Sequence, residues 1–272
     1  MRVCESYELD DGIRVSKWGW SPLGRPLMSV LVYGVDDVLF DTGLSHMGKE
    51  ILAMARRQGV NQVFLTHHHE DHSGNAALMA AELGARVMGH PITIEKMAAP
   101  GPILPYQKLI WGRARPVAVH PIPQGWECRL GPMEVIHTPG HARDHVIYYF
   151  PEKGIVFSGD LFLAERVKYF RADEGVEAQI QSLKSVLELD FDTLLCAHHP
   201  KPKGGKACLQ NKLDFLEEFQ GQILGLHGKG MGASGIFKQL RFKEDRGVQG
   251  LSFGNVSLMN GVRSVIRGAN SI

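Results

Sequence analysis

Short apolar runs alternate with helix-like segments over much of this chain, and this alternation limits the folds available to it. Residues 27–43 contain two short apolar runs around a turn, and residues 46–59 follow as a helix that ends at a glycine. A strand over 61–66, a helix over 74–84 and a strand over 85–90 come next. The order β-α-β-α-β is typical of layered α/β proteins. The sequence therefore predicts an α/β fold.

A proline-rich stretch, residues 91–126, interrupts this pattern. Long irregular segments within a compact domain are usually functional, so we predict an insertion at the active site with one helix near residues 106–113. Regular strands and a helix resume after it. From residue 207 onwards the chain reads as several helices. We therefore predict a catalytic domain over 1–206 and a C-terminal helical extension over 207–272 packed on it.

Composition excludes several classes of protein. The 272 residues are 44% apolar with a formal net charge of +1, so a broad basic surface for nucleic acid is not expected. The start of the chain lacks a basic segment followed by an apolar one, and no apolar run reaches about 20 residues. We expect a cytoplasmic protein with no membrane contact. Its four scattered cysteines indicate reduced thiols: Cys4, Cys128, Cys196 and Cys208.

Polar clusters follow several predicted strands. They are "DTG" at 41–43, "THHHEDH" at 66–72, "TPGH" at 138–141, "SGD" at 158–160 and "AHHP" at 197–200. Strand ends that meet at one edge of a sheet are where α/β folds place their sites. If these clusters meet, they bring together histidine nitrogens and carboxylate oxygens without any thiolate. Such a set suits divalent metals that activate water.

The spacing within "THHHEDHSG" supports a metal site over the alternative of a solvated polar turn. His67 and His69 are two apart on an extended segment, so both side chains point to the same side. Asp71 and His72 follow in the turn and can face a second ion. A carboxylate such as Asp160 can bridge two cations about 3.5–4 Å apart.

These motifs resemble the metallo-β-lactamase superfamily, whose His-x-His-x-Asp-His signature appears here as "HHHEDH". The resemblance covers roughly residues 27–200, since "DTG", "TPGH", "SGD" and a late histidine follow the family's order. It implies a four-layer αββα sandwich. It also implies two metal sites with a shared Asp160, in which the remaining ligands are His67, His69 and His141 at one site and Asp71, His72 and His198 at the other.

The resemblance implies roles for residues around these ligands as well. His198 is preferred to His199 because Ala197-His198 occupies the place of the family's Gly-His pair. Asp41 is expected to hold a ligand imidazole, and His145 to lie just outside the ligands. His68 and Glu70 alternate with the ligands and are expected to be structural.

The implied activity is that of a metal-dependent hydrolase of a small molecule, in which a hydroxide between two metals attacks an ester-like bond, with a thioester or a lactone favoured. Asp71 would orient this hydroxide. Zinc is the favoured metal, with iron or manganese as alternatives. Three other functions stay open: a mononuclear-iron oxidoreductase similar to persulfide dioxygenases, a phosphodiesterase or nuclease, and a non-catalytic ligand sensor.

Substrate contacts are predicted only by position. The insertion 91–126 and the segment 163–170 should flank the metals, which makes Tyr106, Trp111, Arg166 and Tyr169 the predicted contacts. Arg113 and Arg115 are interpreted as solvated, with contact to a substrate anion as the lesser alternative. The C-terminal helices either cover the core or pair with a second subunit in a homodimer.

Overall fold

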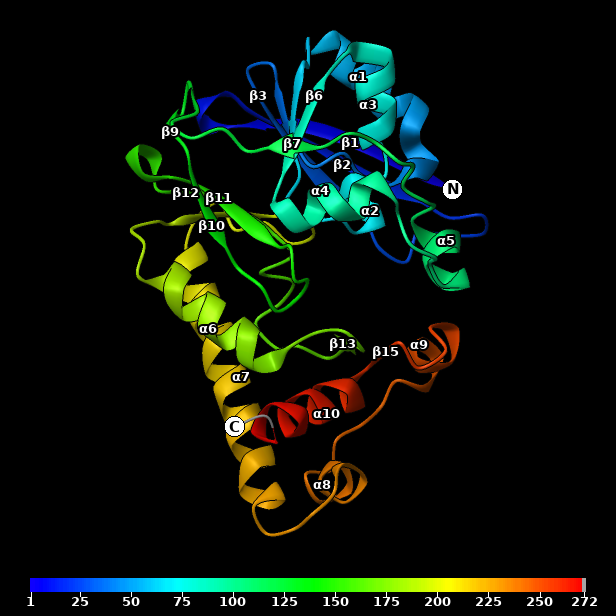
Figure 1. Ribbon diagram of the computed structural model, residues 1–272, viewed down its shortest axis with the longest axis vertical. Coiled ribbons are helices and arrows are strands. Elements are labelled where there is room, and N and C mark those ends of the chain that lie inside the picture. The colour runs from blue at the N-terminus through cyan, green and yellow to red at the C-terminus, as the bar shows by residue number, and fades with distance from the viewer. Residues whose placement is uncertain (271–272) are drawn as a thin grey trace.

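The computed structural model describes residues 1–270, and its two larger sheets pack face to face with helices outside them (Figure 1). The first sheet has the strand order β1 to β7. Its strands are β1 (Arg2–Leu9), β2 (Ile13–Trp20), β3 (Val30–Val35), β4 (Val38–Phe40), β5 (Gln62–Phe64), β6 (Arg86–Gly89) and β7 (His120–Pro121). It is antiparallel from β1 to β4 and parallel from β4 to β7.

The second sheet has the order β10-β11-β12-β14. Its strands are β10 (Glu134–His137), β11 (Val146–Phe150), β12 (Ile155–Gly159) and β14 (Thr193–Cys196). The first three pair antiparallel, and β12 pairs parallel with β14. The carboxyl ends of β12 and β14 therefore lie at the same edge, as those of β4 and β5 do in the first sheet. A further short pair, β8 (Glu127–Cys128) and β9 (Gly131–Pro132), lies between the two sheets in the chain.

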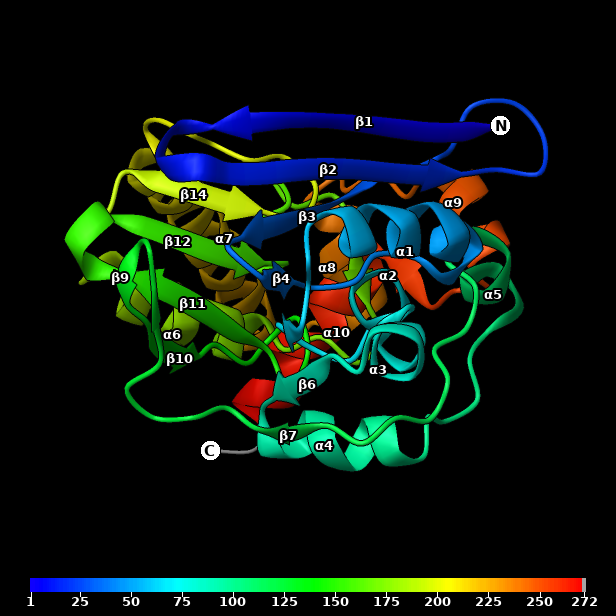
Figure 2. The ribbon, with the colours of Figure 1, turned by 90° about the horizontal axis from the view of Figure 1, so that it is seen from above.

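Three apolar cores separate four layers. The middle core lies between the sheets and contains stacked aromatic rings such as Phe40 and Phe157, whose centroids are 4.3 Å apart. An outer core joins the first sheet to α1 (Gly48–Arg57) and α3 (Ala76–Leu83). The other joins the second sheet to α6 (Val176–Leu187) and the C-terminal helices. Figure 2 shows this layering from above. The predicted four-layer αββα sandwich is confirmed.

Strands β1 and β2 form a long hairpin that is absent from the elements predicted from the sequence. Residues 1–20 lack a continuous apolar run, and most of β1 is exposed. The insertion 91–126 also holds more structure than its one predicted helix. It contains α4 (Pro91–Ala98), which begins at a proline and is capped by the ring of His90, and α5 (Pro105–Ile110). Proline at the first position of a helix is well tolerated.

The C-terminal extension is built into the second outer core. It contains α7 (Gly205–His227), α8 (Ala233–Gln239), α9 (Arg246–Leu251), β15 (Val256–Ser257) and α10 (Leu258–Ala269). Leu209 and Leu216 of α7 are fully buried there with Ile180 of α6. Strand β15 also pairs with β13 (Phe170–Arg171), which precedes α6. The extension thus shares both a core and a strand pair with the residues before it.

No helix among residues 1–270 has the length and apolar character that crossing a bilayer requires.

Candidate metal centre

The predicted polar clusters meet at the edge where the carboxyl ends of the strands of both sheets converge. Two buried tyrosines tie these ends together across the middle core. Tyr148 of β11 donates to the carbonyl of Leu65, 2.6 Å away, and Tyr33 of β3 donates to the carbonyl of Cys196, also 2.6 Å away. Each sheet therefore makes a hydrogen bond to the end of a strand in the other sheet. These two bonds fix the loops after β5 and β14 relative to each other.

A short turn, α2 (Glu70–Ser73), places the second half of the histidine cluster. His67 and His69 precede it on extended backbone, and Asp71 and His72 lie within it. All four are buried. Because the backbone changes from extended to helical here, Asp71 and His72 face a different point from the one that His67 and His69 face.

Three imidazole nitrogens form the first group of possible ligands. Nε2 of His67 lies 2.9 Å from Nδ1 of His69, which lies 3.0 Å from Nε2 of His141. Burial, followed by the neighbouring imidazoles and Arg171, holds the pKa values of His67 and His69 well below the ordinary histidine value. The rings are therefore neutral. Three buried nitrogens facing one point fit a cation that accepts their lone pairs.

The second group contains two carboxylates and two imidazoles, those of Asp71, His72, Asp160 and His198. Nε2 of His72 lies 3.4 Å from Oδ1 of Asp160, and Nε2 of His198 lies 3.5 Å from Oδ2 of Asp71. Within each group, the possible ligand atoms all lie within 4.8 Å of one another. Nε2 of His72 and Oδ1 of Asp160 are buried without any hydrogen-bond partner. Because unpartnered buried polar atoms are costly, this second group also fits a cation.

Asp160 faces both groups. Its Oδ2 lies 3.3 Å from Nε2 of His141, and its Oδ1 lies 3.5 Å from Nε2 of His198. The two oxygens of one carboxylate therefore point at the two groups, as the predicted bridging role requires. Gly159 precedes it with φ +46°, and a Cβ there would lie 2.8 Å from Nε2 of His145. Only glycine fits this position.

The other nitrogen of most of these imidazoles has an oxygen partner. Oδ2 of Asp41 lies 2.7 Å from Nδ1 of His72, and the carbonyl of Ser29 accepts from Nδ1 of His198 at 2.7 Å. Oε1 of Glu174 lies 2.9 Å from Nδ1 of His141. Such partners set the tautomer and orient the nitrogen that faces a metal. Asp41 was predicted at this position, whereas Ser29 and Glu174 were not, because no spacing in the sequence links them to a histidine.

His145 lies beside Asp160, outside both groups. Its Nε2 accepts a hydrogen bond from the backbone N–H of Asp160 at 3.1 Å, and its Nδ1 lies 2.8 Å from the hydroxyl of Thr138. Burial lowers the pKa of His145 to about 3, so the ring is neutral and accepts this bond. The structure thus places His145 where it positions the backbone of Asp160.

His198 and His199 are clearly distinguished. The His198 ring faces Asp71 and Asp160 with its side chain 4% exposed, whereas His199 is exposed on the surface. The backbone N–H of His199 donates to the thiol sulfur of Cys196. The geometry therefore favours His198 as the predicted last ligand.

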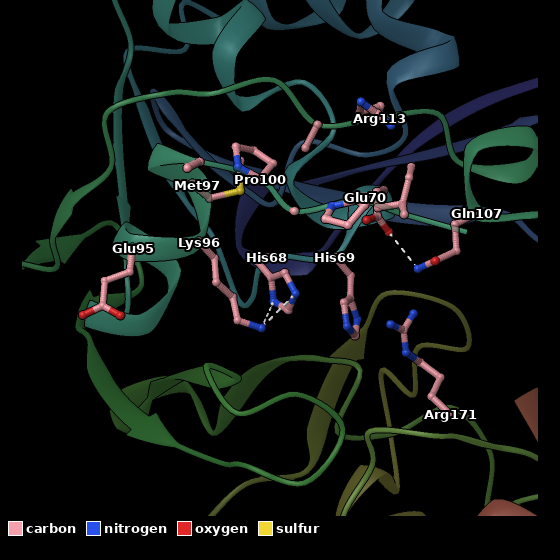
Figure 3. Close-up of a pocket in the computed structure, with 15 residues that line it drawn as sticks. His68, His69, Glu70, Glu95, Lys96, Met97, Pro100, Gln107, Arg113 and Arg171 are labelled. Carbon is pink, nitrogen blue, oxygen red and sulfur yellow. Dashed lines mark hydrogen bonds between the residues drawn. The ribbon is translucent and has the colours of Figure 1, made fainter. Parts of the chain in front are cut away.

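A cavity of about 480 Å³ opens beside the first group (Figure 3). Both His68 and Glu70, which alternate with the predicted ligands, line this cavity. The His68 ring lies 2.9 Å from Oδ1 of Asp144 and 3.0 Å from Nζ of Lys96. Figure 3 shows Arg171 on the opposite side, below His69 and Glu70. The lining residues include His68, His69, Glu70, Glu95, Lys96, Met97, Pro100, Gln107, Arg113 and Arg171.

The four predicted substrate contacts do not line this cavity. Arg166 lies over the ring of Phe215 in α7, 5.6 Å from its centroid, and the hydroxyl of Tyr169 donates to Asp245 beside α9. Tyr106 donates to Oδ1 of Asn255 at 2.6 Å. These three side chains contact the C-terminal extension, whose position over this edge of the fold has no signal in the sequence. Trp111 is buried in the first outer core, with its ring 6.3 Å from that of His198.

The fold and the site together define a class: αββα sandwiches with a histidine and carboxylate centre for divalent metal ions at the edge shared by their two sheets. The chain belongs to the metallo-beta-lactamase superfamily, whose family model matches residues 11–198. The resemblance stated from the motifs is therefore confirmed.

Individual relatives agree with this assignment. A hydroxyacylglutathione hydrolase from Cereibacter sphaeroides is 31% identical over 156 residues, which are 56% of this chain and 53% of that protein. The chain thus spans about half the length of this curated relative. A beta-lactamase domain protein from Burkholderia ambifaria has a TM-score of 0.69 at 18% identity, over 98% of this chain and 88% of that one. This likeness shows the fold alone.

A further solved structure, described as a di-iron-bound form, is 28% identical with a TM-score of 0.55. The aligned region covers 69% of this chain and 96% of that one.

Proposed function

We propose that this chain is a hydrolase with two divalent metal ions that cleaves an ester-like bond of a small molecule, a thioester or a lactone. The observation that carries the proposal is the pair of adjacent ligand groups with Asp160 facing both. The similarity to a relative named for the hydrolysis of an acylated glutathione favours a thioester among ester-like bonds.

The residues of the chain divide the work in this proposal. His67, His69 and His141 would hold one ion, Asp71, His72 and His198 the second, and Asp160 both. Two such ions supply Lewis-acid chemistry, which lowers the pKa of water and polarises a carbonyl group. The buried carboxylate of Asp71 would orient a water molecule and accept its proton. The adjoining cavity would bind the substrate beside His69.

The reaction needs no nucleophile from the protein. The oxygen of water bonds to the acyl carbon, the carbon–sulfur or carbon–oxygen bond breaks, and the departing thiolate or alkoxide takes up a proton. Zinc is the favoured ion, with iron and manganese as alternatives, since all three bind nitrogen and oxygen ligands. The similar solved structure described as a di-iron-bound form supports iron as one of the alternatives.

A substrate screen tests the proposal. Metal-replete protein is assayed on thioesters, lactones, phosphodiesters and β-lactams, with Asp71→Ala as the matched variant. We expect hydrolysis of a thioester or a lactone, reduced at least about 100-fold in Asp71→Ala, as when one group that stabilises developing charge is removed. Equal rates in the two proteins would contradict the role of Asp71.

Metal analysis separates this proposal from an iron oxidoreductase. Protein purified without added metal is expected to hold two metal equivalents per chain, because both ligand groups are complete. A single iron per chain together with oxygen consumption would refute the hydrolase proposal.

A further inference from the structure

A second cavity, of about 580 Å³, lies beside the first and is strongly basic. Segments far apart in the chain line it, from the N-terminal strand, the start of α1 and the turn after α5. Figures 1 and 2 both show the N-terminus, α1 and α5 on the same side of the molecule. Its charged lining consists of five cations and one carboxylate: Arg2, Lys49, Lys108, Arg113, Arg115 and Glu50.

Most of these cations have no carboxylate partner. Glu50 pairs with Arg2. Among residues 1–270, no salt bridge involves Lys49, Lys108, Arg113 or Arg115. Because like charges repel, gathering four unpaired cations around one hollow favours an anionic ligand with more than one charge.

The backbone beneath these cations is fixed. The N–H of Ser45 donates to the carbonyl of Trp111 at 3.0 Å, and the N–H of Arg113 donates to Oγ of Ser45 at 3.0 Å. Gly112 lies between them with φ +85°, and a Cβ there would lie 1.9 Å from that Oγ. This close approach anchors Arg113, and Arg115 follows two residues later. Arg113 and Arg115 therefore project from a turn whose backbone is held in place, whereas Lys49 projects from α1 and Lys108 from α5. A backbone that is already ordered loses less entropy when a ligand binds.

Arg113 also lines the cavity beside the metal centre, so the two cavities adjoin. Figure 3 shows Arg113 across that cavity from Arg171. An extended ligand that passes Arg113 would place one end beside His69 and the other among the four unpaired cations. The hollow is small and the chain as a whole has a net charge of only +1, which favours a compact ligand over a nucleic-acid strand.

We infer that this second cavity binds the phosphate groups of the substrate, and that the substrate is a thioester whose thiol half carries several phosphates. Guanidinium and ammonium groups are the usual protein partners of phosphate. The inference rests on the proposed hydrolase function. Water attacks the acyl carbon, the carbon–sulfur bond breaks, and the thiolate takes up a proton. Lys49, Lys108 and Arg115 would hold the phosphates of the thiol half during this step.

A series of thioesters with one acyl group tests this assignment. Butyryl-coenzyme A, butyryl-dephospho-coenzyme A, butyryl-4′-phosphopantetheine and butyryl-pantetheine share the reacting bond. Each step removes one phosphate, and the second step also removes the adenosine. We expect kcat/KM to fall by about 10- to 100-fold from the first to the last, because several charge-assisted contacts are lost. Added salt should reduce the difference between them, since it screens exposed charges.

Variants assign the effect to the cavity. In Lys49→Gln/Arg115→Gln the ratio of kcat/KM for butyryl-coenzyme A to that for butyryl-pantetheine should fall by about 10-fold, because two charge contacts are lost. The matched control is Lys238→Gln, on α8 and outside both cavities, in which the ratio should stay unchanged. Thermal unfolding of each variant checks that the fold is intact.

A binding experiment makes the test independent of turnover. Calorimetric titration with adenosine 3′,5′-bisphosphate should show binding that weakens about 10-fold in Lys49→Gln/Arg115→Gln, again from two lost charge contacts. Equal kcat/KM across the thioester series would overturn the inference even if the bisphosphate binds, because the cavity would then serve a free phosphorylated ligand. Tighter binding of a single-stranded oligonucleotide than of the bisphosphate would also overturn it.

The same data distinguish this inference from the proposed function. Equal kcat/KM for butyryl-pantetheine and butyryl-coenzyme A would support the hydrolase and refute the binding of substrate phosphates in the second cavity. Absence of hydrolysis of every thioester and lactone by metal-replete protein refutes the hydrolase and, with it, the substrate assigned here.

Discussion

Oε1 of Glu174 lies 2.9 Å from Nδ1 of His141, although the two residues are 33 positions apart in the chain. Both side chains are buried, and the second carboxylate oxygen of Glu174 accepts from Gln179 at 2.9 Å. The carboxylate thus holds a proton on Nδ1 of His141, so that Nε2 faces Asp160 and His69 with its lone pair. This contact connects the loop before α6 to the metal centre.

Replacing Glu174 by glutamine should weaken metal binding about 10-fold, because the imidazole of His141 becomes less basic and less firmly oriented. Competition with a chromophoric chelator measures this affinity. Glu177→Gln is the control, since Glu177 is exposed and bonds only to Gln181 and Gln220 in the described part of the chain. Equal affinities in all three proteins would show that Glu174 does not support the site.

His198→Ala and His199→Ala form a matched pair for the last ligand. We expect His198→Ala to lose most of one metal equivalent per chain, because its Nε2 faces Asp71 and Asp160. His199→Ala should keep the metal content of the parent protein, since His199 is exposed. Elemental analysis after dialysis gives the stoichiometry. The opposite outcome would assign the ligand role to His199.

Leu216→Ala tests whether the extension is part of the fold. Leu216 is fully buried in α7 against the second sheet's helical layer, so the truncation should lower the free energy of unfolding by about 2–5 kcal/mol. Leu224→Ala, on the same helix but 38% exposed, should change it by less than about 0.5 kcal/mol. Urea denaturation followed by circular dichroism compares them. A separate unfolding transition for α7 in Leu216→Ala would show that the extension folds on its own.

Lys212 predicts a pH dependence of stability. It is 3% exposed, its ammonium group donates to the carbonyl of Leu161 at 2.6 Å, and burial lowers its pKa from 10.5 to about 8. The folded state therefore binds fewer protons than the unfolded state between about pH 8 and 10.5, so stability from this residue rises with pH across that window. Below about pH 8 the cost of burying the charge is present in full.

Lys212→Met removes this titration while keeping much of the side-chain volume. The difference in unfolding free energy between Lys212→Met and the parent protein should shift by about 3 kcal/mol over the window, with the variant favoured at low pH. Denaturant titrations at several pH values measure it. A difference that does not change with pH would show that the Lys212 ammonium is not desolvated as its burial indicates.

The sequence alone determined the fold class and the histidines and carboxylates that form the two groups of possible metal ligands. Apolar strands that alternate with helices predict a sheet covered by other layers. Polar residues just past such strands predict a site at the edge where the strands end. His67, His69, Asp71 and His72 are also close together in the chain, so their relative directions follow from local backbone geometry. For these residues, spacing carries the spatial information.

The tertiary structure decided what surrounds that centre. Strand β13 pairs with β15, and next to it Tyr169 and Arg166 contact the C-terminal extension. Their position in the chain had predicted contact with a substrate beside the metals instead. Glu174 meets His141, and Arg115 joins Lys49 in one basic hollow, through the packing of segments with no shared pattern. Such contacts depend on how layers and loops close over each other in three dimensions, and neither periodicity nor local propensity encodes them.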